Sequence, residues 1–263
     1  MRRLSQAIEV VVTVTQLAEE HEVTYPAAAL AYYAFVSQIP VLVLVLAFLG
    51  DSLARQTRTI LPTYLTPDAQ QLVSEALTSA SGGAWAVALA VGVFAWSGAN
   101  IVLGYQTVIE RVEQITERSL LTQLRDAGSI LGSFGLVIVS VILTNLVFGL
   151  LPFGRVFAYS EPIVQFGMLT VAFIPLYYAP SQAVTSLRGA LPGALTAAAG
   201  WTVLLTAIQF YAANAAQYAL FGVLSGIIII LTSLYLASII LMIGVVVNTV
   251  TADTDGVADS RQL

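Results

Sequence analysis

The chain has 263 residues, of which 58% are hydrophobic and only 10% are charged, with a formal net charge of −5 at pH 7. Soluble proteins carry about 25% charged residues, so this composition is typical of a membrane protein and excludes an ordinary soluble domain. The chain has no cysteine and a single histidine, His21, which excludes disulfides, thiolate metal sites and any site built on several histidines.

The hydropathy pattern predicts six membrane-spanning helices, because each crossing needs about 20 apolar residues. From Gly189 to Ala252 there is no Asp, Glu, Lys, Arg or His, a run long enough for two crossings and a turn. We therefore expect an all-α, polytopic membrane helix bundle with a single membrane domain over residues 1–252. The predicted spans are residues 27–49, 84–108, 129–151, 162–180, 190–213 and 223–249.

Two amphipathic helices and an acidic tail are expected outside the spans. Residues 1–22 place apolar side chains such as Leu4 and Ile8 on one stripe, which is typical of a helix lying at the membrane interface, although a soluble cap has a similar pattern. Residues 66–83 begin with an N-cap threonine and end at two glycines, which predicts a second interfacial helix. Residues 253–263 are predicted to be a disordered tail.

The distribution of arginine predicts the orientation in the membrane. All ten basic residues are arginine, and with six spans seven of them fall on the side of both termini and of the loops 109–128 and 181–189. Because the more positive side of a membrane protein is cytoplasmic, we expect a multi-pass protein of the cell (plasma) membrane with both termini in the cytoplasm. The absence of lysine, together with the acidic tail, fits a halophile with a salt-rich cytoplasm. A GC-rich genome would also replace lysine by arginine.

Uncharged polar side chains recur at helical spacing inside the predicted spans. Since polar groups that face lipid are costly, these stripes should face one another, where they either hydrogen-bond helix to helix or line a polar cavity. Pro40 and Pro175 each follow an isoleucine in the first span of a three-span half, which marks either matched broken helices or two ordinary kinks. The clearest stripes are Tyr33, Ser37 and Pro40; Ser97, Asn100 and Gly104; Ser133, Ser140 and Thr144; Thr202, Thr206 and Gln209; and Thr232 and Tyr235.

These stripes give the candidate binding residues. We predict an uncharged polar pocket near mid-membrane, bordered by Tyr33, Ser37, Thr206 and Gln209, because Pro40 leaves the carbonyl of Val36 without its helical partner. The candidate substrate-binding residues are Tyr33, Ser37, Pro40, Asn100, Thr206, Gln209, Tyr211, Tyr218, Tyr235 and Asn248. Arg111, Arg118 and Arg125, spaced by seven, are candidates for binding lipid headgroups, and the alternative is that they only anchor the cytoplasmic face.

The sequence argues against an enzyme. The acids between residues 109 and 126 alternate with arginines, as on a solvated helix, and no nucleophile–base pair or phosphate-binding glycine loop is present. The predicted spans contain none of the acids or histidines that proton- or sodium-coupled carriers use. We therefore expect no catalytic residue, no cofactor, no metal and no nucleic-acid partner.

Ordered motifs along the whole chain resemble the YihY/BrkB membrane protein family. They include Ala28–Ala31 with Tyr32-Tyr33, Ser37 and Pro40; Trp96-Ser97; Leu191-Pro-Gly-Ala194; Trp201; Phe210-Tyr211; Tyr218; Leu234-Tyr235; Gly244; and Asn248. Departures from the family pattern are Glu110 for asparagine, Phe221 for tyrosine, Ser233 for tryptophan and Val246 for an acid. The family was once labelled a ribonuclease, and nothing in these residues supports that activity.

Two functional hypotheses follow. The first is a transporter or scramblase-like conduit that moves a lipid or another amphiphilic substrate through the polar interior. The second is a non-transporting membrane scaffold that assembles with other envelope components. Membrane lipids are the partners expected in either case, and the oligomeric state is left open.

Overall fold

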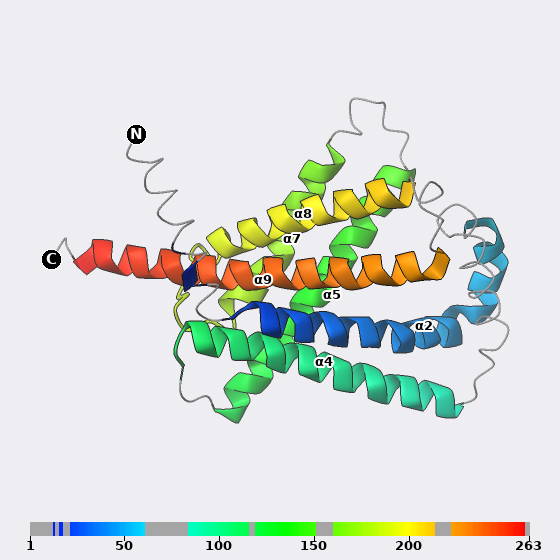
Figure 1. Cartoon of the computed structure of the whole chain (residues 1–263), viewed down its shortest axis with the longest axis horizontal. Helices are drawn as coiled ribbons and strands as arrows, with labels where there is room; N and C mark the ends of the chain where they lie inside the picture. Colours follow the sequence, from blue (N-terminus) through cyan, green and yellow to red (C-terminus); the bar gives the residue numbers. More distant parts are fainter. Residues whose placement is uncertain are drawn as a thin grey trace. The chain divides into compact units, whose positions relative to one another are not determined.

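The computed structural model describes residues 22–60, 84–115, 119–150, 160–213 and 222–260, together with Thr13, Gln16 and Leu17. The long elements in this part of the chain are six helices, and each coincides with one predicted span, which confirms the all-α fold class (Figure 1). They are α2 (Thr24–Ile60), α4 (Ala84–Val112), α5 (Leu120–Leu150), α7 (Glu161–Tyr178), α8 (Leu191–Ala213) and α9 (Gly222–Ser260).

Five of the helices are long and apolar enough to cross a membrane. Their spanning segments are Thr24–Leu44, Val87–Val112, Leu121–Phe148, Leu191–Ala213 and Gly226–Ala252. The remaining helix, α7, forms where the fourth span is predicted but has only 18 residues, among them Glu161 and Gln165. Its crossing of the bilayer therefore stays a prediction, whereas the multi-pass helical character of the protein is clear.

Several helices extend beyond the predicted spans. α5 begins at Leu120 rather than near residue 129, and α9 continues to Ser260, through most of the tail expected to be disordered. The extension of α9 is the physically simpler result, because no proline interrupts it and Thr251 Oγ1 donates to the carbonyl of Val247 at 2.9 Å. Hydropathy locates only the part of a helix that lies in the hydrocarbon core. The predicted interfacial helices at 1–22 and 66–83 lie largely or wholly outside the described residues.

The chain forms two compact units. The first contains Met1–Ala28, Val102–Leu204 and Leu236–Leu263, and the second contains Ala29–Ile101 and Leu205–Tyr235. The core of the first unit consists of apolar side chains that are almost fully buried, including Tyr105, Ile109, Ile130, Leu169, Phe173, Leu176 and Met242. In the second unit Tyr33 of α2 packs edge-to-face on Trp96 of α4, with ring centroids 5.4 Å apart.

Within the first unit α5 packs against α7 through one face with helical spacing. The buried positions of α5 recur every three or four residues and are Asp126, Ile130, Ser133, Val137, Ser140 and Thr144. Positions between them, such as Leu131, Ile138 and Ile142, are exposed apolar side chains suited to contact with lipid. The predicted stripe of Ser133, Ser140 and Thr144 therefore faces the protein interior.

Candidate functional site

Two glycines allow the backbones of α8 and α9 to touch. A Cβ atom at Gly193 would overlap the carbonyl oxygen of Gly244, and a Cβ at Gly244 would overlap the hydroxyl of Tyr177. No other residue has a side chain small enough for this approach. Gly193 belongs to the Leu-Pro-Gly-Ala motif and Gly244 to the motif near the end of the chain, so two sequence motifs meet at one contact.

Asn248 joins the same two helices by hydrogen bonds. Its Oδ1 accepts from the backbone N–H of Gly193 at 2.6 Å, and its Nδ2 donates to the carbonyl of Ala190 at 3.4 Å. The first N–H groups of a helix have no partner within the helix, so Asn248 supplies the missing acceptor at the start of α8. Asn248, one of the candidate substrate-binding residues, therefore has a structural role at this contact, and its role in substrate binding stays a prediction.

Aromatic side chains also contribute to the contact between α8 and α9. Tyr177 donates its hydroxyl to the carbonyl of Leu241 at 2.9 Å, and Trp201 Nε1 donates to the carbonyl of Ala237 at 3.2 Å. Phe173 packs edge-on against Trp201 with a centroid separation of 5.5 Å. The signature residues Gly193, Trp201 and Asn248 thus hold α7, α8 and α9 together.

Glu113, just beyond α4, is held by the loop that follows α7. Its carboxylate accepts from the hydroxyl of Ser181, from the backbone N–H of Gln182 at 2.6 Å and from that of Ala183 at 3.2 Å. Ser181 Oγ in turn accepts from the backbone N–H of Val184 at 3.0 Å. These bonds place the end of α4, the end of α7 and the start of α8 at the same end of the first unit.

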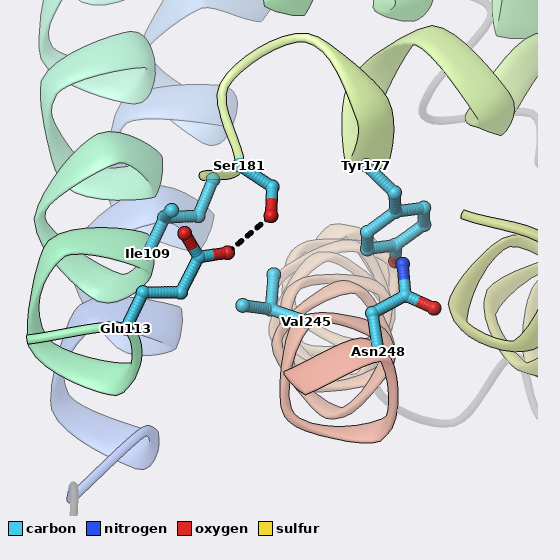
Figure 2. Close-up of a pocket in the computed structure, with 6 residues that line it drawn as sticks. All are labelled: Ile109, Glu113, Tyr177, Ser181, Val245 and Asn248. Atoms are coloured by element: carbon cyan, nitrogen blue, oxygen red, sulfur yellow. Dashed lines mark hydrogen bonds between the residues drawn. The ribbon is translucent and has the colours of Figure 1, made fainter. Parts of the chain in front are cut away.

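A pocket opens beside this carboxylate. It has about 170 Å³ of empty space, its open mouth included, and is lined by Ile109, Glu113, Tyr177, Ser181, Val245 and Asn248 (Figure 2). Only about 10 Å³ of it can be occupied by the centre of a water molecule, so with Glu113 in place the pocket has room for about one water. Figure 2 shows the Glu113 and Ser181 side chains on one side and Tyr177 with the Asn248 amide on the other.

The α5–α7 interface carries a second group of polar atoms, here called the polar seam: Ser133, Ser140, Thr144 and Gln165. All four side chains are buried, with at most 7% of their surface exposed. Thr144 donates to the sulfur of Met168 at 3.3 Å, but Ser133 Oγ and Gln165 Nε2 have no hydrogen-bond partner within the described part of the chain. Ser129, near one end of the seam, donates to the carbonyl of Pro175 at 3.0 Å.

The other predicted substrate-binding residues belong to the second unit. Tyr33 and Asn100 are half-buried and Pro40 is buried, while Ser37 and Asn100 hydrogen-bond carbonyls of their own helices, Ala34 and Trp96. Thr206 and Gln209 are exposed, Tyr211 and Tyr235 are half-buried, and Tyr218 lies outside the described residues. The predicted pocket bordered by Tyr33, Ser37, Thr206 and Gln209 stays a prediction.

The charged residues differ most from expectation. Arg111 and Arg125 are exposed, as headgroup-binding side chains would be, and Arg118 lies outside the described residues. Asp126 was expected on a solvated helix but is only 2% exposed on the buried face of α5, so that expectation is wrong for this residue. Burial is tolerated because a carboxylate inside a protein can be stabilised by polar partners that folding brings to it.

Glu113 was not recognised as a site residue from the sequence, although it lines the pocket. Its neighbours in sequence alternate in charge, as on a solvated helix, and its main donors are backbone N–H groups that no side-chain motif reveals. Within the part of the chain that the structure describes, no three Asp, Glu or His residues gather to hold a metal ion.

Comparisons with known proteins agree with this architecture. The family model described as "Virulence factor BrkB" matches residues 14–262. The chain is also similar to the "Putative ribonuclease-like protein YfkH" of Bacillus subtilis (strain 168), with 28% identity over 257 residues, covering 87% of this chain and 90% of that protein. No solved structure matches the chain. Because the family model covers nearly the whole sequence, the chain belongs to the BrkB virulence factor family of membrane proteins.

Proposed function

We propose that this protein is a conduit for an amphiphile, with a lipid as the natural substrate, and that the polar group of the substrate moves along the polar seam between α5 and α7. The observation that carries the proposal is a pair of buried atoms, Ser133 Oγ and Gln165 Nε2, that have no hydrogen-bond partner among the residues the structure describes. A buried polar group without a partner costs about 1–3 kcal/mol, so a fold that retains two of them on one interface has a reason other than stability.

The seam extends along more than half of the thickness of the hydrocarbon core. Along α5 the seam runs from Ser133 to Thr144, which at 1.5 Å per residue is roughly 17 Å, against a hydrocarbon core of about 30 Å. Substrate hydroxyl or phosphate oxygens would accept from Gln165 and exchange bonds with Ser133 as the two helices separate. The acyl chains would stay in the surrounding lipid, beside the exposed apolar side chains of α5.

The proposed location is the plasma membrane with both termini in the cytoplasm. The exposed Arg111, Arg125 and Arg188 support this orientation, since arginine-rich segments remain on the cytoplasmic side. The proposal includes no nuclease step; the word ribonuclease belongs to the name of the Bacillus relative.

The test is lipid transport by the purified protein in vesicles that contain a fluorescent phospholipid, with a membrane-impermeant quencher to report the outer leaflet. The double variant Ser133→Ala with Gln165→Leu removes both polar groups and nearly conserves volume. Transport should fall at least about tenfold, while stability should be unchanged or higher, because two unpartnered polar atoms are gone.

The matched control is Asn145→Leu on the same helix, at an exposed position where Nδ2 bonds only the carbonyl of Val141 within α5. Transport by the control should equal that of the wild type. If transport is unchanged in the double variant, or falls only together with stability, the seam is not the path of the substrate. That result would favour the scaffold hypothesis.

A further inference from the structure

The loop after α7 presents three hydrogen-bond donors to one point. The backbone N–H groups of Gln182 and Ala183 and the hydroxyl of Ser181, here called the donor site, all converge on the carboxylate of Glu113. Consecutive N–H groups in a turn form concave sites that bind anions. The loop carries a bond of its own, from the N–H of Val184 to Ser181 Oγ, so the turn does not depend on Glu113 alone.

The anion that fills the donor site comes from a distant part of the chain. Glu113 follows α4 and is 68 residues away from Ser181 in sequence. Its side chain is half-buried and lies at the wall of the pocket, so it can swing outward without disturbing the packed core. The site is thus built by one segment and occupied by a carboxylate from another.

Polar groups for a larger anion lie next to the carboxylate, and the space that the carboxylate would vacate adjoins the pocket. The pocket continues from Glu113 and Ser181 to the hydroxyl of Tyr177 and the amide of Asn248 (Figure 2). A phosphate has more acceptor oxygens than a carboxylate, so it could keep the three donors of the loop and turn its other oxygens towards Tyr177 and Asn248.

The two segments that form the donor site each carry an arginine. Arg111 lies two residues before Glu113, and Arg188 lies in the same loop as the donors; both side chains are exposed. Arginine at a membrane surface attracts the phosphate of lipid headgroups. Once Glu113 leaves, its own negative charge is removed from the donors.

We propose that the donor site of Ser181, Gln182 and Ala183 binds a phosphate group, and that Glu113 is an internal stand-in that occupies the site when no ligand is present. The ligand is a phosphate group, either the phosphodiester of a phospholipid headgroup or a phosphate anion free in solution. The inference deepens the proposed function, since a headgroup held here would lie beyond the Ser129 end of the polar seam, but the binding itself does not depend on transport.

The experiment measures binding to the purified full-length protein in detergent. Native mass spectrometry counts bound phosphatidylglycerol, and calorimetry measures binding of inorganic phosphate. Glu113→Ala should raise the affinity for phosphate at least about tenfold, because the carboxylate no longer competes for the three donors; this factor corresponds to one charge-assisted hydrogen bond. Glu113→Gln should give an intermediate affinity, because its neutral amide competes more weakly than the carboxylate. Adding Ser181→Ala to Glu113→Ala should reverse the gain.

The control is Glu110→Gln, which removes the same charge one turn earlier and should leave binding unchanged. A gain with phosphatidylglycerol alone identifies a lipid headgroup as the ligand, and a gain with inorganic phosphate alone identifies a free anion. Unchanged or weaker binding of both ligands to the Glu113 variants would overturn the proposal.

If Glu113→Ala does not fold, the affinity of Glu113→Gln tests the proposal. This variant should fold, since its amide can still accept from the backbone donors and donate to Ser181. Transport is not measured, so failure here leaves the polar seam untouched. Conversely, failure of the seam variants leaves this binding site standing.

Discussion

Replacing Gly193 by alanine should separate α8 from α9. The new Cβ would overlap the carbonyl oxygen of Gly244, which is backbone and cannot rotate away, and would lie 2.7 Å from Cγ of Asn248. Overpacking of this kind costs about 1–3 kcal/mol. The hydrogen bond from the Gly193 N–H to Asn248 adds about 0.5–1.5 kcal/mol when it is lost. The higher helix propensity of alanine offsets about 1 kcal/mol of this, which leaves a net loss of roughly 0.5–3.5 kcal/mol.

Unfolding of the purified protein in mixed micelles, followed by circular dichroism, measures this loss. Gly226→Ala is the matched control, since nothing lies within 4 Å of a Cβ at that position of α9, and it should be neutral or slightly stabilising. Gly200→Ala should fall between the two, because its Cβ would meet only the side chain of Ile240, at 2.6 Å. A Gly193→Ala variant as stable as the control would refute the close approach of the two backbones.

Two further predictions concern the same end of the protein and its orientation. Asn248→Leu should destabilise the protein by about 1–3 kcal/mol in the same unfolding assay, because it leaves the N–H of Gly193 without its acceptor, while the carbonyl of Ala190 keeps its bond from the N–H of Ala194. Asn145→Leu should have little effect, and equal losses would contradict the capping role. Accessibility labelling in intact cells should place both termini and the 109–128 loop in the cytoplasm, and termini on opposite faces would mean that α7 does not cross the bilayer.

The number and order of the helices could be predicted from sequence because a hydrocarbon core imposes a minimum length of apolar chain on every crossing. The ends of the helices could not be predicted in this way, since a helix such as α9 continues past its apolar segment wherever no residue stops it. Ser260, at the end of α9, lies well beyond that segment. The burial of Ser133, Ser140 and Thr144 was also predictable, because their spacing puts them on one face of a helix.

The candidate site was only partly predictable. Asn248 was found through its motif, but its partners Gly193 and Ala190 are more than 50 residues away, and hydrophobic periodicity carries no information on such pairings. Glu113 was missed because its ligands include backbone atoms, which every residue has, so only the folded loop distinguishes Gln182 and Ala183 from any other pair. Asp126 was misread because its neighbours in sequence are charged, whereas its burial depends on helix packing.

The long sequence separation of the bond between Gly193 and Asn248 bears on the order of assembly during synthesis. The two residues are 55 positions apart, and ribosomes add about 5–20 residues per second, so the start of α8 waits roughly 3–11 s for its acceptor. During that interval α8 is in the bilayer or its translocation channel with the amide of Gly193 still unpaired. A chain that terminates before Asn248 would keep that defect permanently and should be a preferred target of membrane quality-control proteases.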